Sequence, residues 1–299
     1  MLLRHLQYLV ALARAQHFAR AAASCAVTQP TLSSGIKQLE EEMGVLLVFR
    51  GQRFEGFTPE GERVLGWAQR IVDECDGLKQ EAARLRGELQ GQLRMGAVPT
   101  AIPLLPILLN AYSDAHPRVR LILRSSSSSQ ILSGIEAHTL DAGINYLGLT
   151  GASSVREFPL FRERYVLLVG KQHAIAEAGK LPWRDVPDLR YCLLAAEMQN
   201  RRIIDETLAA AGVTLEPAIE TDSAAALVPL INSGEWASIV PRSLLGMLPV
   251  DGQVVALDLV DPVVEPAIGL LVAARDPLAP VAAALAELAQ ALVTFPADE

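Results

Sequence analysis

The sequence predicts an α/β protein that begins with a winged helix-turn-helix, continues as a long helix and ends in a body of two α/β subdomains. Three observations lead to this prediction. The first 58 residues combine short helical patterns with an apolar hairpin, residues 59–90 repeat apolar positions every seven residues, and strands alternate with helices from residue 91 onward. We therefore expect three parts: residues 1–58, 59–90 and 91–299.

The N-terminal part is predicted to hold three short helices. Apolar residues recur on one face of residues 2–14, and alanines dominate residues 18–26. A third helix begins behind Thr28, a good N-cap, with Pro30 in its first turn, and Gly44 suits its end. Its apolar positions recur at helical spacing and are expected to be buried: Leu32, Ile36, Leu39 and Met43.

The opposite face of this third helix bears short polar side chains near its N-terminus. They are Gln29, Thr31, Ser33, Ser34 and Lys37, with Pro30 beside them. In a helix-turn-helix, the first residues of the recognition helix contact base edges in the major groove, where Gln can bind adenine. Taken alone, the pattern fits an ordinary capped surface helix with a solvated acidic end equally well.

The following residues favour DNA binding. Two short apolar segments surround Gly51-Gln52, a pair suited to a type II′ hairpin, and Arg50 and Arg53 flank this turn where a wing could contact phosphate. The net charge is −8, yet residues 1–58 hold six Lys/Arg against four acids, whereas the remainder holds 20 against 30. A mildly basic module on an acidic body is compatible with DNA binding.

Residues 59–90 are predicted to form one helix that pairs with its copy in another subunit. Thr58 is a suitable N-cap, Pro59 occupies the first helical position, and no proline follows before residue 90. Apolar or small residues form an a/d seam: Val64, Ala68, Ile71, Cys75, Leu78, Ala82, Leu85 and Leu89. The alternative is an amphipathic helix that packs on its own chain.

From residue 91, five segments read as strand, helix, strand, helix and strand, which predicts a parallel sheet covered by helices. They are residues 91–98, 100–116, 119–124, 129–140 and 141–147. A second set predicts strands at 164–170, 191–196, 216–221, 236–241 and 266–273, with helices at 200–212, 223–234 and 281–293. We expect subdomain I at about 91–160 and 265–299, and subdomain II at about 161–264, with the chain crossing near 158–162 and 262–266.

Polar residues cluster where predicted strands give way to helices. Ligands of open α/β sheets bind beyond the carboxyl ends of strands, often against helix N-termini. The candidate ligand-binding residues are Thr100, Ser127, Ser128, Gln199, Asn200 and Asp222. Hydroxyls and free N–H groups suit a small carboxylate or another polar anion, although Asp222 would repel one unless it bonds a ligand hydroxyl or amine. For the serine run 125–129, a flexible loop is the alternative.

Several classes of function lack support in the sequence. There is no P-loop, nucleophile elbow, zinc-protease His pair or dinucleotide fingerprint, and the five histidines have no metal-ligand spacing. We therefore predict neither an enzyme nor a cofactor nor a metal site. No apolar run reaches the roughly 18 residues of a membrane span, and the N-terminus lacks the form of a signal peptide, which predicts a cytoplasmic protein without a membrane partner.

The longest motifs are "LQYLVALARAQHFARAAASCAVTQPTLSSGIKQLEEEMGVLLVFR" and "FTPEGERVL", followed by "LDAGI" and "GEWASIVP". With these motifs the chain resembles the LysR-type transcriptional regulators over essentially its full length. The resemblance implies a winged helix-turn-helix, a dimerising linker helix and an effector domain similar to periplasmic binding proteins. It also implies a homotetramer, a dimer of dimers, on double-stranded promoter DNA, and RNA polymerase is a candidate further partner.

The resemblance also assigns individual residues. It implies base contacts for Gln29, Pro30 and Ser33, wing or backbone contacts for Arg50 and Arg53, and effector contacts for Thr100 and Ser128. Ser34-Gly35 departs from the family, which commonly has an arginine and a larger residue there. One phosphate contact is therefore in doubt, and Gly35 is expected to cost about 1 kcal/mol of helix stability relative to Ala.

We thus predict a DNA-binding regulator whose promoter binding responds to a small polar, carboxylate-bearing effector between the two subdomains. A redox-responsive regulator of the same family is one alternative, although Cys192 is the only cysteine of the predicted effector body and no disulfide can form within it. A cytosolic solute-binding protein is another, but it does not account for the first 90 residues.

Overall fold

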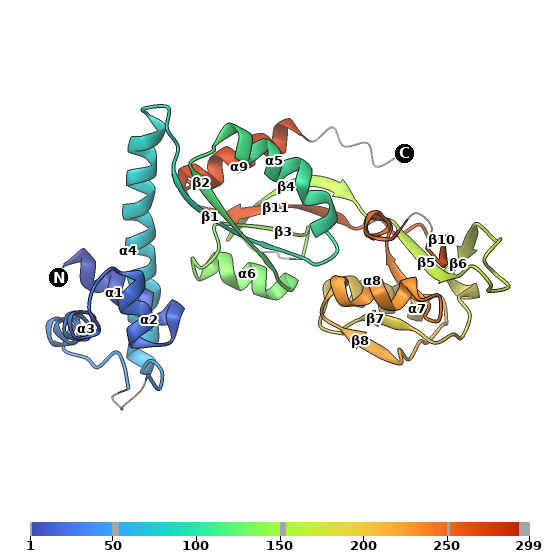
Figure 1. The fold of residues 1–299 in the computed structure, drawn as a ribbon, viewed down its shortest axis with the longest axis horizontal. Helices are drawn as coiled ribbons and strands as arrows, with labels where there is room; N and C mark the ends of the chain where they lie inside the picture. The colour runs from blue at the N-terminus through green and yellow to red at the C-terminus, as the bar shows by residue number, and fades with distance from the viewer. Residues whose placement is uncertain (1, 50–53, 150–153, 250–251, 293–299) are drawn as a thin grey trace. The chain divides into compact units, whose positions relative to one another are not determined.

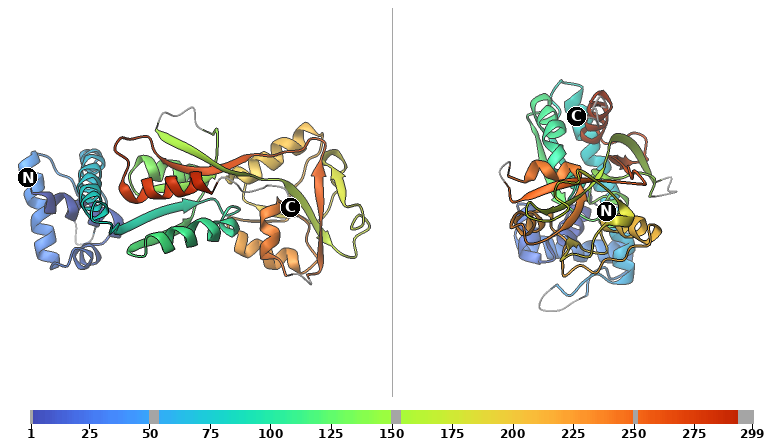
Figure 2. Two further views of the ribbon diagram at one scale, coloured as in Figure 1. Left: turned by 90° about the horizontal axis from the view of Figure 1, so that it is seen from above. Right: turned by 90° about the vertical axis from the view of Figure 1, so that its right-hand side faces the viewer.

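The computed structural model describes residues 2–49, 54–149, 154–249 and 252–292. The chain divides into two compact units, Met1–Leu89 and Gln90–Glu299. Figure 1 follows the chain from its blue N-terminal helices to the red strand and helix near its C-terminus, and Figure 2 gives two further views. The predicted fold class is confirmed: a helix-turn-helix and a long helix precede an α/β body.

The first unit contains four helices: α1 (Leu3–Ala15), α2 (Phe18–Ser24), α3 (Gln29–Met43) and α4 (Pro59–Arg84). The predicted start and end of α3 are confirmed. The side chain of Thr28 accepts a hydrogen bond from the Thr31 amide, and Gly44 ends the helix with φ 70°. These two residues supply what the helix ends require, an acceptor for a free N–H group and a left-handed backbone.

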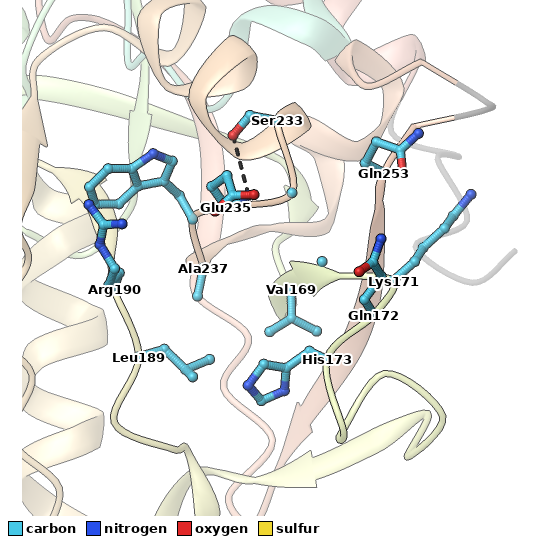
Figure 3. A pocket seen from close by; sticks show the side chains of 13 residues that line it. Val169, Lys171, Gln172, His173, Leu189, Arg190, Ser233, Glu235, Ala237 and Gln253 are labelled. Atoms are coloured by element: carbon cyan, nitrogen blue, oxygen red, sulfur yellow. Dashed lines mark hydrogen bonds between the residues drawn. The ribbon is translucent and has the colours of Figure 1, made fainter.

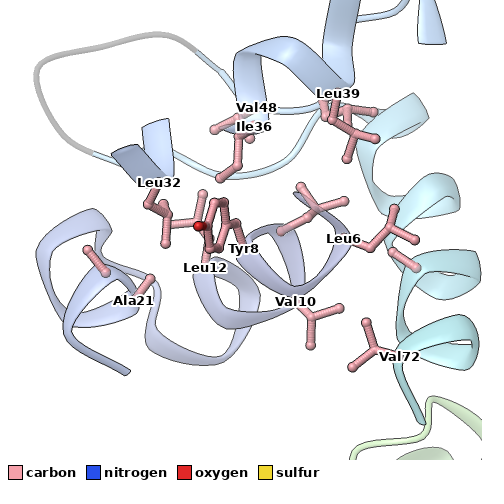
Figure 4. Packing of buried hydrophobic residues seen from close by; sticks show 14 residues of the cluster. Leu6, Tyr8, Val10, Leu12, Ala21, Leu32, Ile36, Leu39, Val48 and Val72 are labelled. Atoms are coloured by element: carbon pink, nitrogen blue, oxygen red, sulfur yellow. The ribbon is translucent and has the colours of Figure 1, made fainter. Parts of the chain in front are cut away.

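The core of this unit forms where α1, α3 and α4 meet, as Figure 4 shows. Leu9, Leu32 and Leu39 are fully buried in it. Met43 was expected in the same stripe but is 41% exposed, because it is the last residue of α3 and extends past the core.

Gly35 has a packing role in this core. A Cβ atom at this position would lie 2.6 Å from the Tyr8 ring, so the missing side chain lets α3 approach α1 closely. Glycine at this position therefore permits tight packing of α3 on α1. The closer contact offsets the expected loss of helix stability relative to alanine.

A short antiparallel bridge between Val48 and Phe57 begins the predicted hairpin. The Thr58 amide donates to Leu47 O at 3.0 Å, and the Phe49 amide donates to Gly56 O at 3.1 Å. The turn itself, with Arg50, Gly51-Gln52 and Arg53, lies outside the described residues.

Glu40 links this hairpin to α3. Its buried carboxylate accepts hydrogen bonds from the amides of Leu47 at 2.9 Å and Val48 at 3.2 Å. The acidic end of α3 is therefore not uniformly solvated, since one of its three glutamates holds the chain that follows.

The long helix is shorter than predicted. Thr58 caps it through a 2.9 Å bond from the Gly61 amide, as expected, but α4 ends at Arg84 rather than near residue 90. Gly87 takes a positive φ of 75°, and the amides of Gly87 and Glu88 turn back to Arg84 O and Ala83 O. The left-handed backbone at Gly87 follows the end of the helix, so Leu85 and Leu89 of the predicted heptad pattern lie outside α4.

The second unit contains a five-stranded sheet in the order β2-β1-β3-β11-β4, which we call subdomain I. Its strands are β1 (Gly91–Ala97), β2 (Val119–Ser125), β3 (Ala142–Tyr146), β4 (Val155–Arg162) and β11 (Ala267–Ala273). The first three strands are parallel, as predicted. β11 is antiparallel to both β3 and β4, so the sheet is mixed.

Helices cover both faces of this sheet (Figure 1). α5 and α9 pack on each other, whereas α6 packs on β3 and β1 from the opposite face. Their bounds are η1 (Ile102–Leu104), α5 (Leu105–Ala115), α6 (Ser128–Glu136) and α9 (Pro280–Ala291).

Subdomain II combines a four-stranded sheet, β6-β10-β5-β9, with the parallel pair β7-β8. Its strands are β5 (Tyr165–Gly170), β6 (Lys180–Pro182), β7 (Cys192–Leu194), β8 (Ile219–Thr221), β9 (Ser238–Pro241) and β10 (Val254–Val260). Its helices are η2 (Trp183–Asp185), α7 (Gln199–Ala210), α8 (Ala224–Asn232) and η3 (Arg242–Met247). β5 is antiparallel to both of its neighbours.

The sequence pattern did not predict β4, β6 or β10. Pro159 lies inside β4, and a proline is tolerated there because β4 is an edge strand. β4 extends to Arg162, so the chain crosses to subdomain II at residues 163–164, just beyond the predicted range. The second crossing, between β10 and β11, falls at residues 261–266 and overlaps its prediction. Among the described residues, no helix is both long and apolar enough to cross a membrane.

Candidate nucleic-acid interface and ligand cleft

The polar face of α3 is open to solvent. All the residues of this helix that were predicted to meet DNA are exposed: Gln29, Pro30, Thr31, Ser33, Ser34 and Lys37. They occupy one side because Leu32, Ile36 and Leu39 on the other side are buried in the core. We call this set the α3 surface.

The α3 surface is held in place by local contacts. The hydroxyls of Thr28 and Thr31 lie 2.8 Å apart, which orders the start of the helix. Lys37 forms an exposed ion pair with Glu41 at 3.4 Å, a contact that contributes little to stability and leaves the ammonium available. The surface thus offers an amide, several hydroxyls and one cation, which are groups that bind base edges and phosphates.

The predicted dimerisation residues divide into two groups. Val64 and Ala68 pack against the core of their own unit, as the alternative interpretation of α4 required. Ile71, Leu78 and Leu85 are 37%, 72% and 77% exposed, and Ala82 is also exposed, whereas Cys75 is half-buried. Among the described residues, the second half of α4 therefore exposes an apolar stripe that includes Ile71 and Leu78, and Leu85 is exposed just past the helix end.

Four of the six candidate ligand-binding residues line one small pocket between the two subdomains. They are Thr100, Ser128, Gln199 and Asn200. This cleft pocket is completed by Val98, Pro99, Tyr146, Leu194 and Met198. Its volume of about 10 Å³ is roughly the space of one water molecule.

The remaining two candidates do not line the cleft pocket. Ser127 caps α6, since its hydroxyl accepts from the Gln130 amide at 3.3 Å while its own amide donates to Gln130 Oε1 at 2.9 Å. Its hydroxyl is thus used within the helix end. Asp222 is exposed one residue before the Ser223 cap of α8, so its charge is directed to solvent.

A buried acid beside the pocket was missed by the sequence analysis. Glu163 is only 3% exposed and lies at the first crossing between subdomains. The Tyr146 hydroxyl donates to Glu163 Oε2 at 2.8 Å, and the Thr100 hydroxyl lies 3.4 Å from the same Tyr146 oxygen. Burial raises the pKa of Glu163 to about 7, although hydrogen bonds from Tyr146 and Thr100 act in the opposite direction.

Several buried side-chain polar atoms in this region make no hydrogen bond of ordinary geometry. Among the described residues, the buried side-chain atoms without a hydrogen bond include Ser128 Oγ, Glu163 Oε1, Tyr165 OH and Asn200 Nδ2. Burial and the neighbouring Glu163 charge raise the pKa of the Tyr165 hydroxyl, whereas its interactions with Tyr146 and Asn200 act in the opposite direction; the hydroxyl remains neutral. These residues are far apart in the sequence, so only knowledge of how the two subdomains pack at the crossing could have revealed the cluster.

Two larger pockets lie elsewhere in this unit. One, of about 350 Å³, is lined by apolar residues of η1, α5, β4 and η3 together with Arg162, Glu163, Arg164 and Arg242. The other, of about 400 Å³, lies in subdomain II and is shown in Figure 3. There the Arg190 guanidinium stacks 4.3 Å from the Trp236 ring centroid beside Val169, Leu189 and His173. Neither pocket is lined by a predicted ligand-binding residue.

The three cysteines are all free thiols in this structure. Cys192 is buried in β7, and burial raises the pKa of its thiol, which lowers its reactivity. Cys25 and Cys75 are half-buried in the other unit. No group of three or more His, Cys, Asp or Glu in the described part of the chain is arranged to hold a metal ion.

Two family models match the chain. "Bacterial regulatory helix-turn-helix protein, lysR family" matches residues 3–62, and "LysR substrate binding domain" matches residues 86–293. Together they cover the α3 surface and the cleft pocket.

Two curated relatives are about one third identical to this chain over the aligned residues. A hydrogen peroxide-inducible genes activator from Haemophilus influenzae is 36% identical over 181 residues, or 60% of each chain. The DNA-binding transcriptional dual regulator OxyR of Escherichia coli is 34% identical over 193 residues, 64% of this chain and 63% of that protein. The matched part thus spans less than two thirds of either relative.

Solved structures resemble the chain over nearly its whole length. A full-length OxyR cysteine variant from Pseudomonas aeruginosa is 28% identical with a TM-score of 0.80, and the match covers 97% of this chain and 95% of that one. CbnR in complex with its target DNA is 22% identical with a TM-score of 0.68, covering 98% of this chain and all of that one. The CbnR likeness establishes the fold alone.

Proposed function

Because this chain belongs to the LysR family of bacterial transcription regulators, we propose that it binds promoter DNA through the α3 surface and that a small molecule in the cleft pocket adjusts this binding. The family consists of regulators rather than enzymes. The observation behind the DNA-binding half is the open polar face of α3 within the matched helix-turn-helix.

The DNA contacts follow from the chemistry of that face. Gln29 and the serines Ser33 and Ser34 can exchange hydrogen bonds with base edges, whereas Lys37 can neutralise a phosphate. Arg50 and Arg53, in the proposed wing, remain proposed phosphate contacts. Since promoter DNA is the proposed partner, we also propose that the protein acts in the cytoplasm and that RNA polymerase is a further partner.

Self-association is proposed through α4. Ile71 and Leu78 expose apolar area on a helix whose N-terminal half packs one face on the core of its own unit. A second copy would remove this area from water, which is the main driving force for pairing. A dimer of such dimers remains our proposed assembly.

The ligand half of the proposal is supported by the cleft pocket. Residues from both subdomains line it, so a molecule bound there changes the free energy of closing one subdomain on the other. Thr100 and Ser128 come from subdomain I, and Gln199 and Asn200 come from the start of α7 in subdomain II.

The test is fluorescence anisotropy of the purified protein with its own upstream intergenic DNA. A scrambled duplex of equal composition serves as the control, and both are titrated at several salt concentrations. We expect tighter binding to the native duplex and an affinity that falls as salt rises. Equal, weak binding to both duplexes would contradict the assignment of the α3 surface.

A redox-responsive regulator of the same family is the second candidate, and the names of the relatives support it better than they support a carboxylate-binding regulator. Two of them are called hydrogen peroxide-inducible genes activators or OxyR, and one solved relative is an OxyR variant from Corynebacterium glutamicum with bound hydrogen peroxide. In this chain, a thiol mechanism within the effector body would depend on Cys192 alone, which is buried.

Free-thiol titration before and after peroxide treatment separates the two candidates. A loss of thiols together with altered DNA binding that Cys192→Ser abolishes would favour the redox function. An unchanged thiol count with an unchanged DNA affinity would count against it.

A further inference from the structure

The pocket of about 350 Å³ is separate from the cleft pocket and combines apolar walls with Arg162, Arg164 and Arg242. We call it the arginine pocket. Clefts of this size that join apolar walls to a few polar groups are typical of small-molecule sites. We propose that the arginine pocket binds a medium-chain aliphatic monocarboxylate, with the chain against the apolar walls and the carboxylate on Arg162. This second site goes beyond the proposed function and does not rest on it.

The walls determine the body of the ligand. Six of the thirteen lining residues are leucines, and Ile107 and Phe161 add to the apolar surface. Ile107 is 50% exposed, so a ligand that covers it removes apolar area from water. Among the described lining residues Phe161 is the one aromatic side chain, which leaves little for a flat ring to stack on. A flexible saturated chain can follow a wall of branched side chains, so we assign an aliphatic body.

The arginines determine the charge of the ligand. Arg162 Nη1 donates to the backbone carbonyl of Glu265 at 3.1 Å, and Arg164 Nε donates to Glu265 Oε1 at 2.5 Å. Because both guanidinium groups bind Glu265, they lie close together. Arg242 forms an ion pair with Asp258. Two of the three arginines therefore already have a carboxylate partner.

Arg162 differs from the other two arginines. Within the part of the chain that the structure describes, it forms no ion pair, and its hydrogen bond goes to a backbone carbonyl. Its exposed guanidinium has further N–H donors, and their planar arrangement matches the two oxygens of a carboxylate. One cation without an acidic partner beside an apolar wall calls for one negative charge on an apolar body. The ligand is thus a monocarboxylate rather than a dicarboxylate.

Glu163 also lines the arginine pocket, but its carboxyl is engaged on the side of the cleft pocket. It is only 3% exposed, and its Oε2 accepts a 2.8 Å hydrogen bond from Tyr146, which lines the cleft pocket. The side chains of Arg164 and Arg242, by contrast, are 52% and 54% exposed. The charges that an approaching anion meets first are therefore those of the arginines.

Both subdomains contribute to the arginine pocket. Leu108 and Phe161 belong to subdomain I, whereas Ser243 and Leu245 belong to η3 of subdomain II. The Ser243 hydroxyl donates to the backbone carbonyl of Thr100 at 3.2 Å, which joins the two subdomains beside the pocket. A ligand in the arginine pocket contacts both subdomains, so its affinity depends on how they pack on each other.

Octanoate and octanamide are matched probes, because they share one alkyl chain and differ in the charge of the head group. Each is titrated into the full-length protein without DNA, at constant salt and below the concentration at which octanoate forms micelles. Saturation-transfer NMR measures the dissociation constant of each probe. We expect octanoate to bind more tightly than octanamide.

The variant Arg162→Gln tests the head group, and Arg156→Gln is its matched control. Arg156 lies on the same strand, β4, is exposed and also donates to a backbone carbonyl, that of Arg275, at 3.0 Å, but it does not line the pocket. We expect Arg162→Gln to weaken octanoate binding about tenfold, as the loss of a charged hydrogen-bond partner implies. Arg156→Gln should bind octanoate like wild type, and octanamide should bind all three proteins alike.

The variant Ile107→Glu tests the apolar wall. Its site is half exposed, so the fold should tolerate the change, while the new carboxylate interrupts the wall and repels an anion. We expect it to weaken both probes, and octanoate more than octanamide.

Several results would overturn the proposal. They are octanamide binding as tightly as octanoate, equal losses in Arg162→Gln and Arg156→Gln, unchanged binding in Ile107→Glu, and no saturation transfer to octanoate at all. None of these measurements involves DNA. A failure here together with specific promoter binding would reject the second site and leave the proposed regulator function standing.

Discussion

The α3 surface and the cleft pocket both use short polar side chains, but in opposite environments. On α3, Gln29, Ser33 and Ser34 are exposed, so their hydrogen-bonding groups are open to solvent and, under the proposed function, to DNA. In the cleft, Ser128, Asn200 and Glu163 are buried, so a missing partner costs free energy at once. The comparison teaches that recognition of a large partner can rely on exposed groups, whereas a small ligand is selected by groups already removed from water.

The largest expected effect lies in the cleft, at Glu163. Its pKa is raised to about 7 in the folded protein from an ordinary 4.5. The folded state therefore binds this proton more tightly than the unfolded state, and its stabilising contribution is complete below pH 4.5 and lost as pH rises through 7. The shift corresponds to roughly 3 kcal/mol.

Urea unfolding of wild type and Glu163→Gln across this range measures the contribution as the pH-dependent difference between the two proteins. Glu206→Gln, an exposed change, should show no such difference. A constant gap between wild type and Glu163→Gln from acid to neutral pH would mean that Glu163 is not a buried acid, and the contrast with α3 would weaken.

The next effect, about 2 kcal/mol, is expected for Tyr146→Phe. Removing the hydroxyl leaves Glu163 Oε2 without the 2.8 Å bond from Tyr146, and hydrogen bonds to charged groups are worth more than neutral ones. Tyr112→Phe is the matched control, because the Tyr112 hydroxyl donates to a backbone carbonyl, Val281 O, at 2.9 Å. Chemical unfolding should show a larger loss for Tyr146→Phe than for Tyr112→Phe, and equal losses would argue against a special role for the buried acid.

On the α3 surface, Gln29→Ala should lower affinity for the native operator about tenfold, since one bidentate base contact is worth about 1–3 kcal/mol. The free energy of unfolding should hardly change, because the side chain is exposed. Anisotropy titrations with native and scrambled duplexes test this. A similar loss on both duplexes would show that Gln29 positions the backbone and does not read bases.

The smallest effect is expected for Lys37→Ala. Its ion pair with Glu41 is exposed and contributes little to stability, so the change should mainly remove one phosphate contact. The slope of log affinity against log salt should become about 0.9 less steep on every duplex. A slope equal to that of wild type would place Lys37 away from the phosphates.

The same contrast explains what the sequence could predict. Caps and helix ends such as Thr28, Gly44 and Thr58 were recognised because they depend on neighbours a few residues away. The exposed side of α3 follows from the same local periodicity. Thr100, Ser128, Gln199 and Asn200 could be proposed because strand-to-helix junctions gather at one sheet edge.

Glu163 could not be predicted in this way. Its neighbours Arg162 and Arg164 are exposed, and its burial arises only when residues as distant as Thr100 and Tyr146 close over it. The end of α4 was missed for a related reason, since Gly87 is compatible with a helix until its positive φ is known. β4 was missed because a proline such as Pro159 argues against a strand, unless that strand is known to lie at the edge of its sheet.

The hydrogen bonds from the amides of Leu47 and Val48 to Glu40 bear on the shape of the duplex that the proposed DNA-binding surface would accept. The buried carboxylate ties the helix to the start of the hairpin, so under the proposed function the two would contact a duplex at a fixed spacing. A rigid protein surface favours duplexes whose groove width already matches its spacing. Other sequences must be deformed to bind, which costs free energy. Under that proposal Glu40 would influence sequence preference without touching a base, because its two hydrogen bonds keep this spacing rigid.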